Sequence, residues 1–151
     1  MAEMCEVTSE SDIRAVAQLA REIWTEQYTP IIGREQVDYM LDEMQSPGAI
    51  RSQIEEGHRY FLLREDGEDV GYWAVVPEPD EDRMKLSKIY VRKDSRGRGL
   101  GRQMVEAAEE LCCERGLAKL WLRVNRHNSD SIAAYRSMGF ENVETDVKTI
   151  G

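Results

Sequence analysis

The chain has 151 residues, of which 41% are hydrophobic and 32% charged, and its formal net charge is −9 at pH 7. This composition is typical of a globular protein with room for a hydrophobic core, and it excludes a disordered or fibrous chain. The net negative charge argues against a nucleic-acid partner, which needs a basic surface, and no apolar run approaches the roughly 20 residues of a membrane-spanning helix.

The N-terminal third is predicted to be mainly helical after a short strand at residues 4–8. Apolar side chains recur at intervals of three and four residues over 13–24 and again over 37–44, which is the period of an amphipathic helix. Pro30 and Gly33 lie between these two segments and are predicted to separate the helices.

The middle of the chain is predicted to form three antiparallel strands after a third helix. That helix begins at Ser46-Pro47, because serine is a favourable N-cap and proline suits the first turn. Residues 60–63, 70–76 and 84–92 are rich in aromatic and β-branched side chains. Asp66-Gly67 lies between the first two of these strands and is typical of a hairpin turn.

The last third alternates between helix and strand. A glycine-rich loop follows the 84–92 strand, helical spacing resumes over 100–115, and residues 119–125 alternate as a strand does. A final helix is predicted to end near Met138, and a last strand to begin at Phe140. Because a strand–helix–strand crossover joins parallel strands, the strands 84–92 and 119–125 should run parallel.

We expect one cytoplasmic domain, residues 1–151, without a resident metal. The N-terminus lacks the basic and apolar segments of a signal peptide, and three cysteines, an odd number, argue against a disulfide framework. The two histidines lie far apart in the sequence and have no carboxylate partners at ligand spacing.

The loop Arg96-Gly97-Arg98-Gly99-Leu100-Gly101 lies in the most basic segment of this acidic chain. Its glycines permit backbone conformations in which successive N–H groups converge on an anion at a helix N-terminus. The P-loop and dinucleotide patterns fit poorly, because no Lys-Ser or Lys-Thr follows and Leu120 and Trp121 stand where the second pattern needs an acid. A flexible turn with solubilising arginines is the alternative.

Two blocks of residues resemble the GNAT superfamily of N-acetyltransferases. Arg96, Gly99 and Gly101, after Lys88-Ile89-Tyr90-Val91, are similar to the family's acetyl-CoA pyrophosphate loop. The second block is similar to the family's pattern of Asn, Ala, Tyr and Gly-Phe, and it comprises Asn125, Asn128, Ala133 or Ala134, Tyr135 and Met138-Gly139-Phe140. The resemblance is best over residues 59–140.

The resemblance implies the GNAT fold, an α/β architecture whose central, mostly antiparallel sheet is flanked by helices and contains one parallel pair of strands that splay apart. Acetyl-CoA, as co-substrate, would insert between these two strands. The cofactor-binding residues implied are Ile89, Tyr90, Val91, Arg96, Gly97, Arg98, Gly99, Leu100, Gly101 and Asn128. Because 11 residues follow Phe140, the family's final strand is expected to be missing or shortened, and an exposed edge there would favour a homodimer.

The implied chemistry is direct attack of a primary amine on the thioester in a ternary complex. Backbone N–H groups of the 84–92 strand, often at a bulge, would polarise the thioester carbonyl. Tyr135 is the candidate general acid, with packing of its helix as the alternative. The base stays unassigned, with a water relay, Glu22 or Glu26 as candidates. An N-cap role explains Asn128 equally well.

The acceptor pocket of the family would be lined by residues 24–32, and in this chain the candidates are Trp24, Glu26, Tyr28 and Ile31. Core packing is the more natural role for Trp24. A loose resemblance to bacterial polyamine-type acetyltransferases, with the acidic charge, favours a small amine or polyamine. The alternatives are acetylation of a protein N-terminus or lysine, and a noncatalytic CoA-binding regulatory module, which the fold does not exclude.

Overall fold

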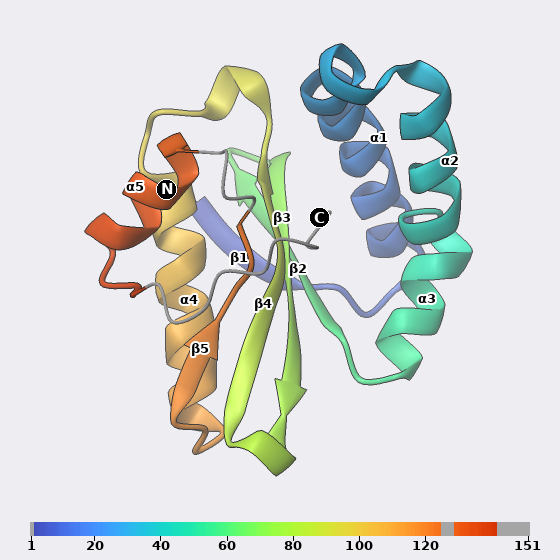
Figure 1. Ribbon diagram of the computed structural model, residues 1–151. Coiled ribbons are helices and arrows are strands. Elements are labelled where there is room, and N and C mark those ends of the chain that lie inside the picture. Colours follow the sequence, from blue (N-terminus) through green and yellow to red (C-terminus); the bar gives the residue numbers. More distant parts are fainter. Residues whose placement is uncertain (1, 125–128, 142–151) are drawn as a thin grey trace.

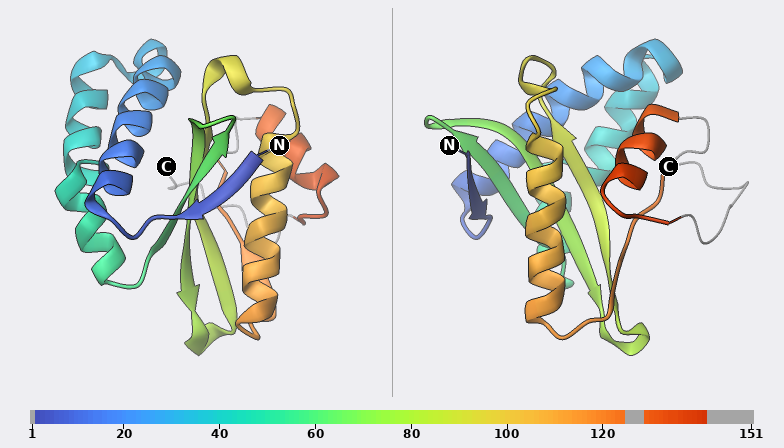
Figure 2. Two further views of the ribbon diagram at one scale, coloured as in Figure 1. Left: turned by 180° about the vertical axis from the view of Figure 1, so that it is seen from behind. Right: turned by 90° about the vertical axis from the view of Figure 1, so that its left-hand side faces the viewer.

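A five-stranded sheet lies between two layers of helices in the computed structural model, which describes residues 2–124 and 129–141 (Figure 1). The strands, in sheet order, are β1 (Ala2–Glu6), β2 (Arg59–Glu65), β3 (Glu68–Glu78), β4 (Arg83–Val91) and β5 (Lys119–Trp121). The helices are α1 (Glu10–Ile32), α2 (Arg34–Met44), α3 (Pro47–Glu55), α4 (Leu100–Glu114) and α5 (Ser129–Ser137). Helices α1, α2 and α3 lie on one side of the sheet and α4 and α5 on the other (Figure 2).

The predicted α/β architecture is confirmed, and the main difference concerns α1. Its N-cap is Ser9, whose hydroxyl accepts a hydrogen bond from the Asp12 N–H, so the helix begins before Ile13, where the predicted apolar repeat starts. It then continues through Pro30, because a proline near a helix end removes one N–H without displacing a following turn. Gly33, with φ of +88°, alone separates α1 from α2.

The sheet is antiparallel from β1 to β4 and parallel between β4 and β5, as predicted. The β4–β5 pairing covers three residue pairs and ends at Lys85 and Trp121, although β4 continues to Val91. β5 is therefore shorter than the predicted strand 119–125. Phe140 is not in a strand, and the expected change in the family's final strand concerns residues outside the described ranges.

A β-bulge interrupts β4 at Ser87. Ala74 of β3 pairs with Lys88, but the next residue, Val75, pairs with Leu86, so Ser87 is the extra residue. The Ser87 hydroxyl donates to the Ala74 carbonyl at 3.3 Å. The bulge changes which side chains of β4 face each helical layer.

Two hydrophobic clusters lie on opposite faces of the sheet. Along β3, Tyr72 and Ala74 belong to the cluster under α1 and α3, whereas Trp73 and Val75 belong to the cluster under α4. This alternation is the two-residue period of a strand buried on both faces. Burying each large side chain contributes about 1.5–3 kcal/mol, so both layers stabilise the sheet. None of the helices in the described ranges combines the length and apolarity needed to cross a bilayer.

We expect Gly71→Ala to lower the free energy of unfolding by about 1–3 kcal/mol, the usual cost of overpacking. A Cβ at Gly71 of β3 would lie 2.6 Å from the Tyr90 carbonyl oxygen and 3.1 Å from Met104 Cε, so the backbone of β4 would have to move. Gly48→Ala in α3 is the control, because no atom lies within 4 Å of its Cβ position and alanine favours the helix. Urea denaturation measures both variants, and equal midpoints would contradict the close approach of β3 and β4.

Candidate active site

The glycine-rich loop joins β4 to α4 through a short 3₁₀ helix, η2 (Lys93–Ser95). Gly97 and Gly99 have φ values of +82° and +79°, a backbone conformation that residues with a Cβ rarely adopt. Gly99 is the N-cap of α4. Gly101 is already inside the first turn of the helix. The loop therefore has the position and the backbone conformation predicted for it.

Open space lies beside the glycine-rich loop at the start of α4. A Cβ on Gly97, Gly99 or Gly101 would meet no atom within 4 Å, so these glycines leave open space beside the first N–H groups of α4. Those N–H groups have no acceptor within the helix, and the helix dipole is positive there. A cavity of about 320 Å³ adjoins the loop. Its lining residues are Ile89, Val91, Ser95, Arg96, Gly97, Gly99, Leu100, Gly101, Ser131, Ala134, Tyr135 and Met138.

Tyr135 of α5 lines the same cavity as the loop. Its half-buried ring packs against Phe140 at a centroid distance of 5.8 Å. Burial raises the pKa of the Tyr135 hydroxyl, and the nearby Tyr28 adds to the shift. The hydroxyl is therefore protonated over the physiological pH range and can donate a hydrogen bond into the cavity. Asn128, the other residue expected there, lies outside the described ranges.

The backbone of β4 beyond the bulge forms one wall of the cavity. Ile89 and Val91 line it, whereas Tyr90 faces α1. No described residue pairs with β4 on the β5 side after Lys85, so alternate N–H and C=O groups of this segment are not part of the sheet ladder there. The Val91 carbonyl accepts a hydrogen bond from Arg96 Nε at 3.1 Å, and the other groups can hydrogen-bond a ligand.

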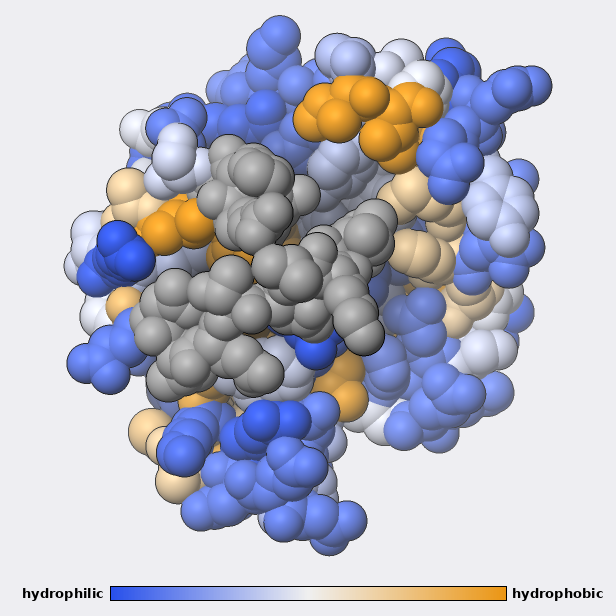
Figure 3. Space-filling model, in the orientation of Figure 1, coloured by the Kyte–Doolittle hydropathy of each residue, from blue (hydrophilic) through white to orange (hydrophobic). Residues whose placement is uncertain are grey.

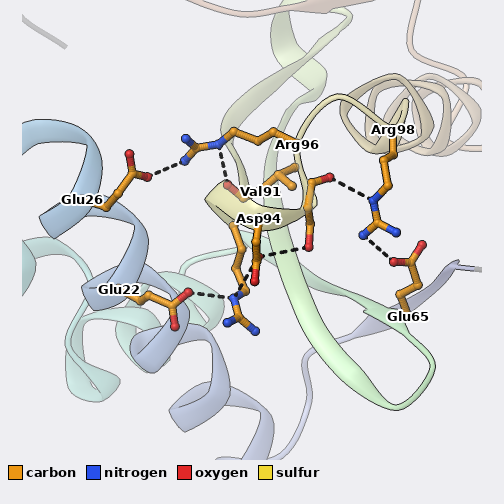
Figure 4. Close-up of polar contacts among 9 residues, drawn as sticks. Glu22, Glu26, Glu65, Val91, Asp94, Arg96 and Arg98 are labelled. Atoms are coloured by element: carbon orange, nitrogen blue, oxygen red, sulfur yellow. Dashed lines mark hydrogen bonds and ion pairs between the residues drawn. The ribbon is translucent and has the colours of Figure 1, made fainter.

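Arginines around the loop form ion pairs with carboxylates of α1 and β2. Arg92 contacts Glu22 at 2.7 Å, and Glu22 appears with the loop in Figure 4. Arg96 contacts Glu26, which like Glu22 is on α1, at 2.8 Å. Arg98 contacts Glu65 of β2 at 2.6 Å. The basic side chains thus have acidic neighbours that sequence reasoning missed, because the partners are distant in the chain.

Residues 24–32, predicted to lie between two helices, are instead the C-terminal part of α1. Trp24 is 3% exposed and belongs to the core, in line with its more natural role. The Tyr28 hydroxyl lies 3.2 Å from the Tyr90 hydroxyl. Ile31 is 74% exposed and does not line the cavity. An exposed apolar patch is visible at the upper right of Figure 3.

Two basic groups lie on or near the sheet face that α1 and α3 cover. Lys88 shares that face with its cross-strand partner Ala74, and burial lowers the pKa of Lys88, with a further contribution from Lys85. Burial, and then Lys88, lower the pKa of His58. The described residues include no group of three His, Cys, Asp or Glu side chains that could hold a metal ion.

Residues 15–140 match the model of the acetyltransferase (GNAT) family. An uncharacterized N-acetyltransferase from the pepI 3′ region of Lactobacillus delbrueckii subsp. lactis is 29% identical over 95% of this chain and 87% of its own length. Streptothricin acetyltransferase of Streptomyces lavendulae is 39% identical, over 56% of this chain and 45% of its length.

A solved structure, the PaiA N-acetyltransferase of Thermoplasma acidophilum in complex with coenzyme A, has the same fold. Its TM-score is 0.83 at 22% identity, and the match covers 97% of this chain and 94% of that one. The fold expected from the two sequence blocks is therefore present.

We expect the free energy of unfolding to fall as the pH is lowered from about 7 to about 5, and to fall less in His58→Gln. Burial in the folded state holds the pKa of His58 below its ordinary value of 6.5, so the unfolded chain binds more protons in this window and is stabilised relative to the folded state. Hydrogen bonds from Arg59 and Arg51 lower the pKa values of Glu6 and Glu10, so these carboxyls affect the curve mainly below their ordinary pKa of 4.5. Denaturant titrations at several pH values test this, and parallel curves for the two proteins would refute it.

Proposed function

The chain belongs to the acetyltransferase (GNAT) family, and from this premise we propose that it transfers an acetyl group from acetyl-CoA to the primary amine of a small molecule, such as a polyamine. The reaction would be a direct attack within a ternary complex. The observation that carries this proposal is that the glycine-rich loop and the Tyr135 side chain line one cavity. The chain would act as one domain of 151 residues.

The N–H groups of the loop and of the first turn of α4 would bind the pyrophosphate of the donor. Leu100 and Gly101 are the first two residues of that turn. Ile89, Tyr90 and Val91 would align the rest of the donor along β4, beyond the point where β5 stops pairing. The thioester supplies an activated acetyl group when it is bound. Holding it beside the amine supplies much of the rate, because the two reactants no longer have to meet in solution.

Tyr135 would donate a hydrogen bond to the sulfur as negative charge develops on it, which is the role of a general acid or of an electrostatic stabiliser. Its raised pKa keeps the proton on the hydroxyl, so the group can donate throughout the neutral range. An amine with a pKa near 10 must lose a proton before it attacks. Glu22, Glu26 and a water relay remain the candidates for that step.

A small cationic acceptor is supported by the net charge of −9 and by the carboxylates on α1. Streptothricin acetyltransferase, one of the relatives, is named for a small-molecule substrate. A protein N-terminus is the second candidate, because the [ribosomal protein bS18]-alanine N-acetyltransferase of Salmonella typhimurium is 34% identical over 56% of this chain. A cytoplasmic location and a homodimer stay predictions from the sequence.

A panel of acceptors distinguishes these possibilities. We expect release of free thiol from acetyl-CoA with spermidine or a similar amine, and none above background with peptides that present an N-terminal alanine or a lysine. Turnover with peptides alone would replace the small-molecule proposal by the second candidate. Binding of CoA in calorimetry without turnover of any acceptor would favour a noncatalytic CoA-binding module.

We expect Tyr135→Phe to lower kcat about 100-fold at neutral pH and to leave the KM for acetyl-CoA nearly unchanged, because general acid catalysis contributes about 10²–10⁴-fold. Phenylalanine keeps the ring that packs on Phe140 and removes the hydroxyl. Tyr39→Phe is the matched control, since Tyr39 is exposed on α2 and does not line the cavity. An unchanged kcat in Tyr135→Phe would remove the catalytic assignment and leave a packing role.

A further inference from the structure

The ion pairs around the glycine-rich loop connect the donor side of the site to α1. Arg96 reaches from the loop to Glu26 of α1 and also donates to the Val91 carbonyl at 3.1 Å (Figure 4). The side chains of Arg96 and Glu26 are 34% and 33% exposed, so each is partly shielded from water. A partly shielded charge gains more from its partner than a fully exposed charge does.

A pyrophosphate bound at the loop would compete with Glu26 for Arg96. Arg96 lines the cavity beside the loop, and a guanidinium makes strong, charge-assisted hydrogen bonds with phosphate oxygens. The added negative charge would also repel the Glu26 carboxylate. When Arg96 turns toward the phosphates, Glu26 is left without its cation.

The surroundings of Glu26 would then favour a new cation. α1 has no basic residue in its last turn, and the C-terminal end of a helix carries partial negative charge. Pro30 has no N–H, so the Glu26 carbonyl also lacks the helical hydrogen bond that residue 30 would otherwise donate. Tyr28, on the same part of α1, contacts Tyr90 on the face of β4 turned away from the donor cavity. An acceptor that approaches β4 from the α1 side would pass this negative site.

We propose that Glu26 is a specificity-determining residue for cationic acceptors, and that Arg96 masks it until the pyrophosphate of acetyl-CoA binds Arg96. This inference rests on the proposed function. It makes the two substrates cooperate, because each draws one partner of the ion pair, and donor binding then increases acceptor affinity. By the same linkage, the acceptor increases donor affinity.

Glu26→Gln tests the inference because it should move the two affinities in opposite directions. By calorimetry, CoA alone should bind the variant about two- to fivefold more tightly than it binds the wild type, the range that exposed ion pairs span, since the competing carboxylate is gone. Spermidine should bind the CoA-saturated wild type about two- to fivefold more tightly than the free protein, because the same ion pair is broken only once for both ligands, and this difference should vanish in Glu26→Gln.

Glu65→Gln is the matched control. It removes the partner of Arg98, which lies on β2 rather than on α1. This variant should tighten CoA binding to a similar extent but retain the coupling between CoA and spermidine. Both measurements are of binding and need no turnover, so they remain informative if the proposed reaction fails. Unchanged or weaker CoA binding by Glu26→Gln, or equal coupling in wild type and Glu26→Gln, would overturn the inference.

Discussion

The site depends on the incomplete pairing of β4. This strand is hydrogen-bonded to β3 along its length, but its pairing with β5 ends at Lys85. On the β5 side, the backbone groups of β4 beyond that point have no partner strand among the described residues, so water, side chains or a ligand can hydrogen-bond them. The glycine-rich loop and α5 surround this segment, and the cavity that they form with β4 is where the donor is proposed to bind. The bulge at Ser87 precedes it and fixes which side chains of β4 face the cavity.

Charge is distributed around this cavity so that the basic loop is not an isolated positive patch. Its arginines meet carboxylates from α1 and β2, which lie on either side of the loop (Figure 4). Each pair is modest by itself, about 0–1 kcal/mol for exposed partners. These pairs nevertheless affect anion binding, because an incoming anion must displace carboxylates from several arginines rather than bind free cations.

Local signals in the sequence predicted the parts of the fold that short segments determine. The Asp66-Gly67 hairpin, the Ser46-Pro47 helix start and the Gly97 and Gly99 conformations follow from the residues themselves. The early end of β5 and the continuation of α1 through Pro30 depend on tertiary packing, which periodicity does not report. The partners of the arginines, such as Glu65 for Arg98, could not be predicted because any of 29 acidic residues could have filled that role.

The two hydrophobic clusters have few ways to influence each other, because the sheet lies between them. Val16, Leu41 and Ile50 are contributed to one cluster by α1, α2 and α3, whereas Met104 and Ala108 are contributed to the other by α4. We expect substitutions within the helices of the first cluster to change the packing of the second cluster less than that of the first, because the sheet separates their side chains. If the α1–α3 layer is the acceptor side, as proposed, this architecture would allow that side to diversify during evolution while the glycine-rich loop on the other side is retained.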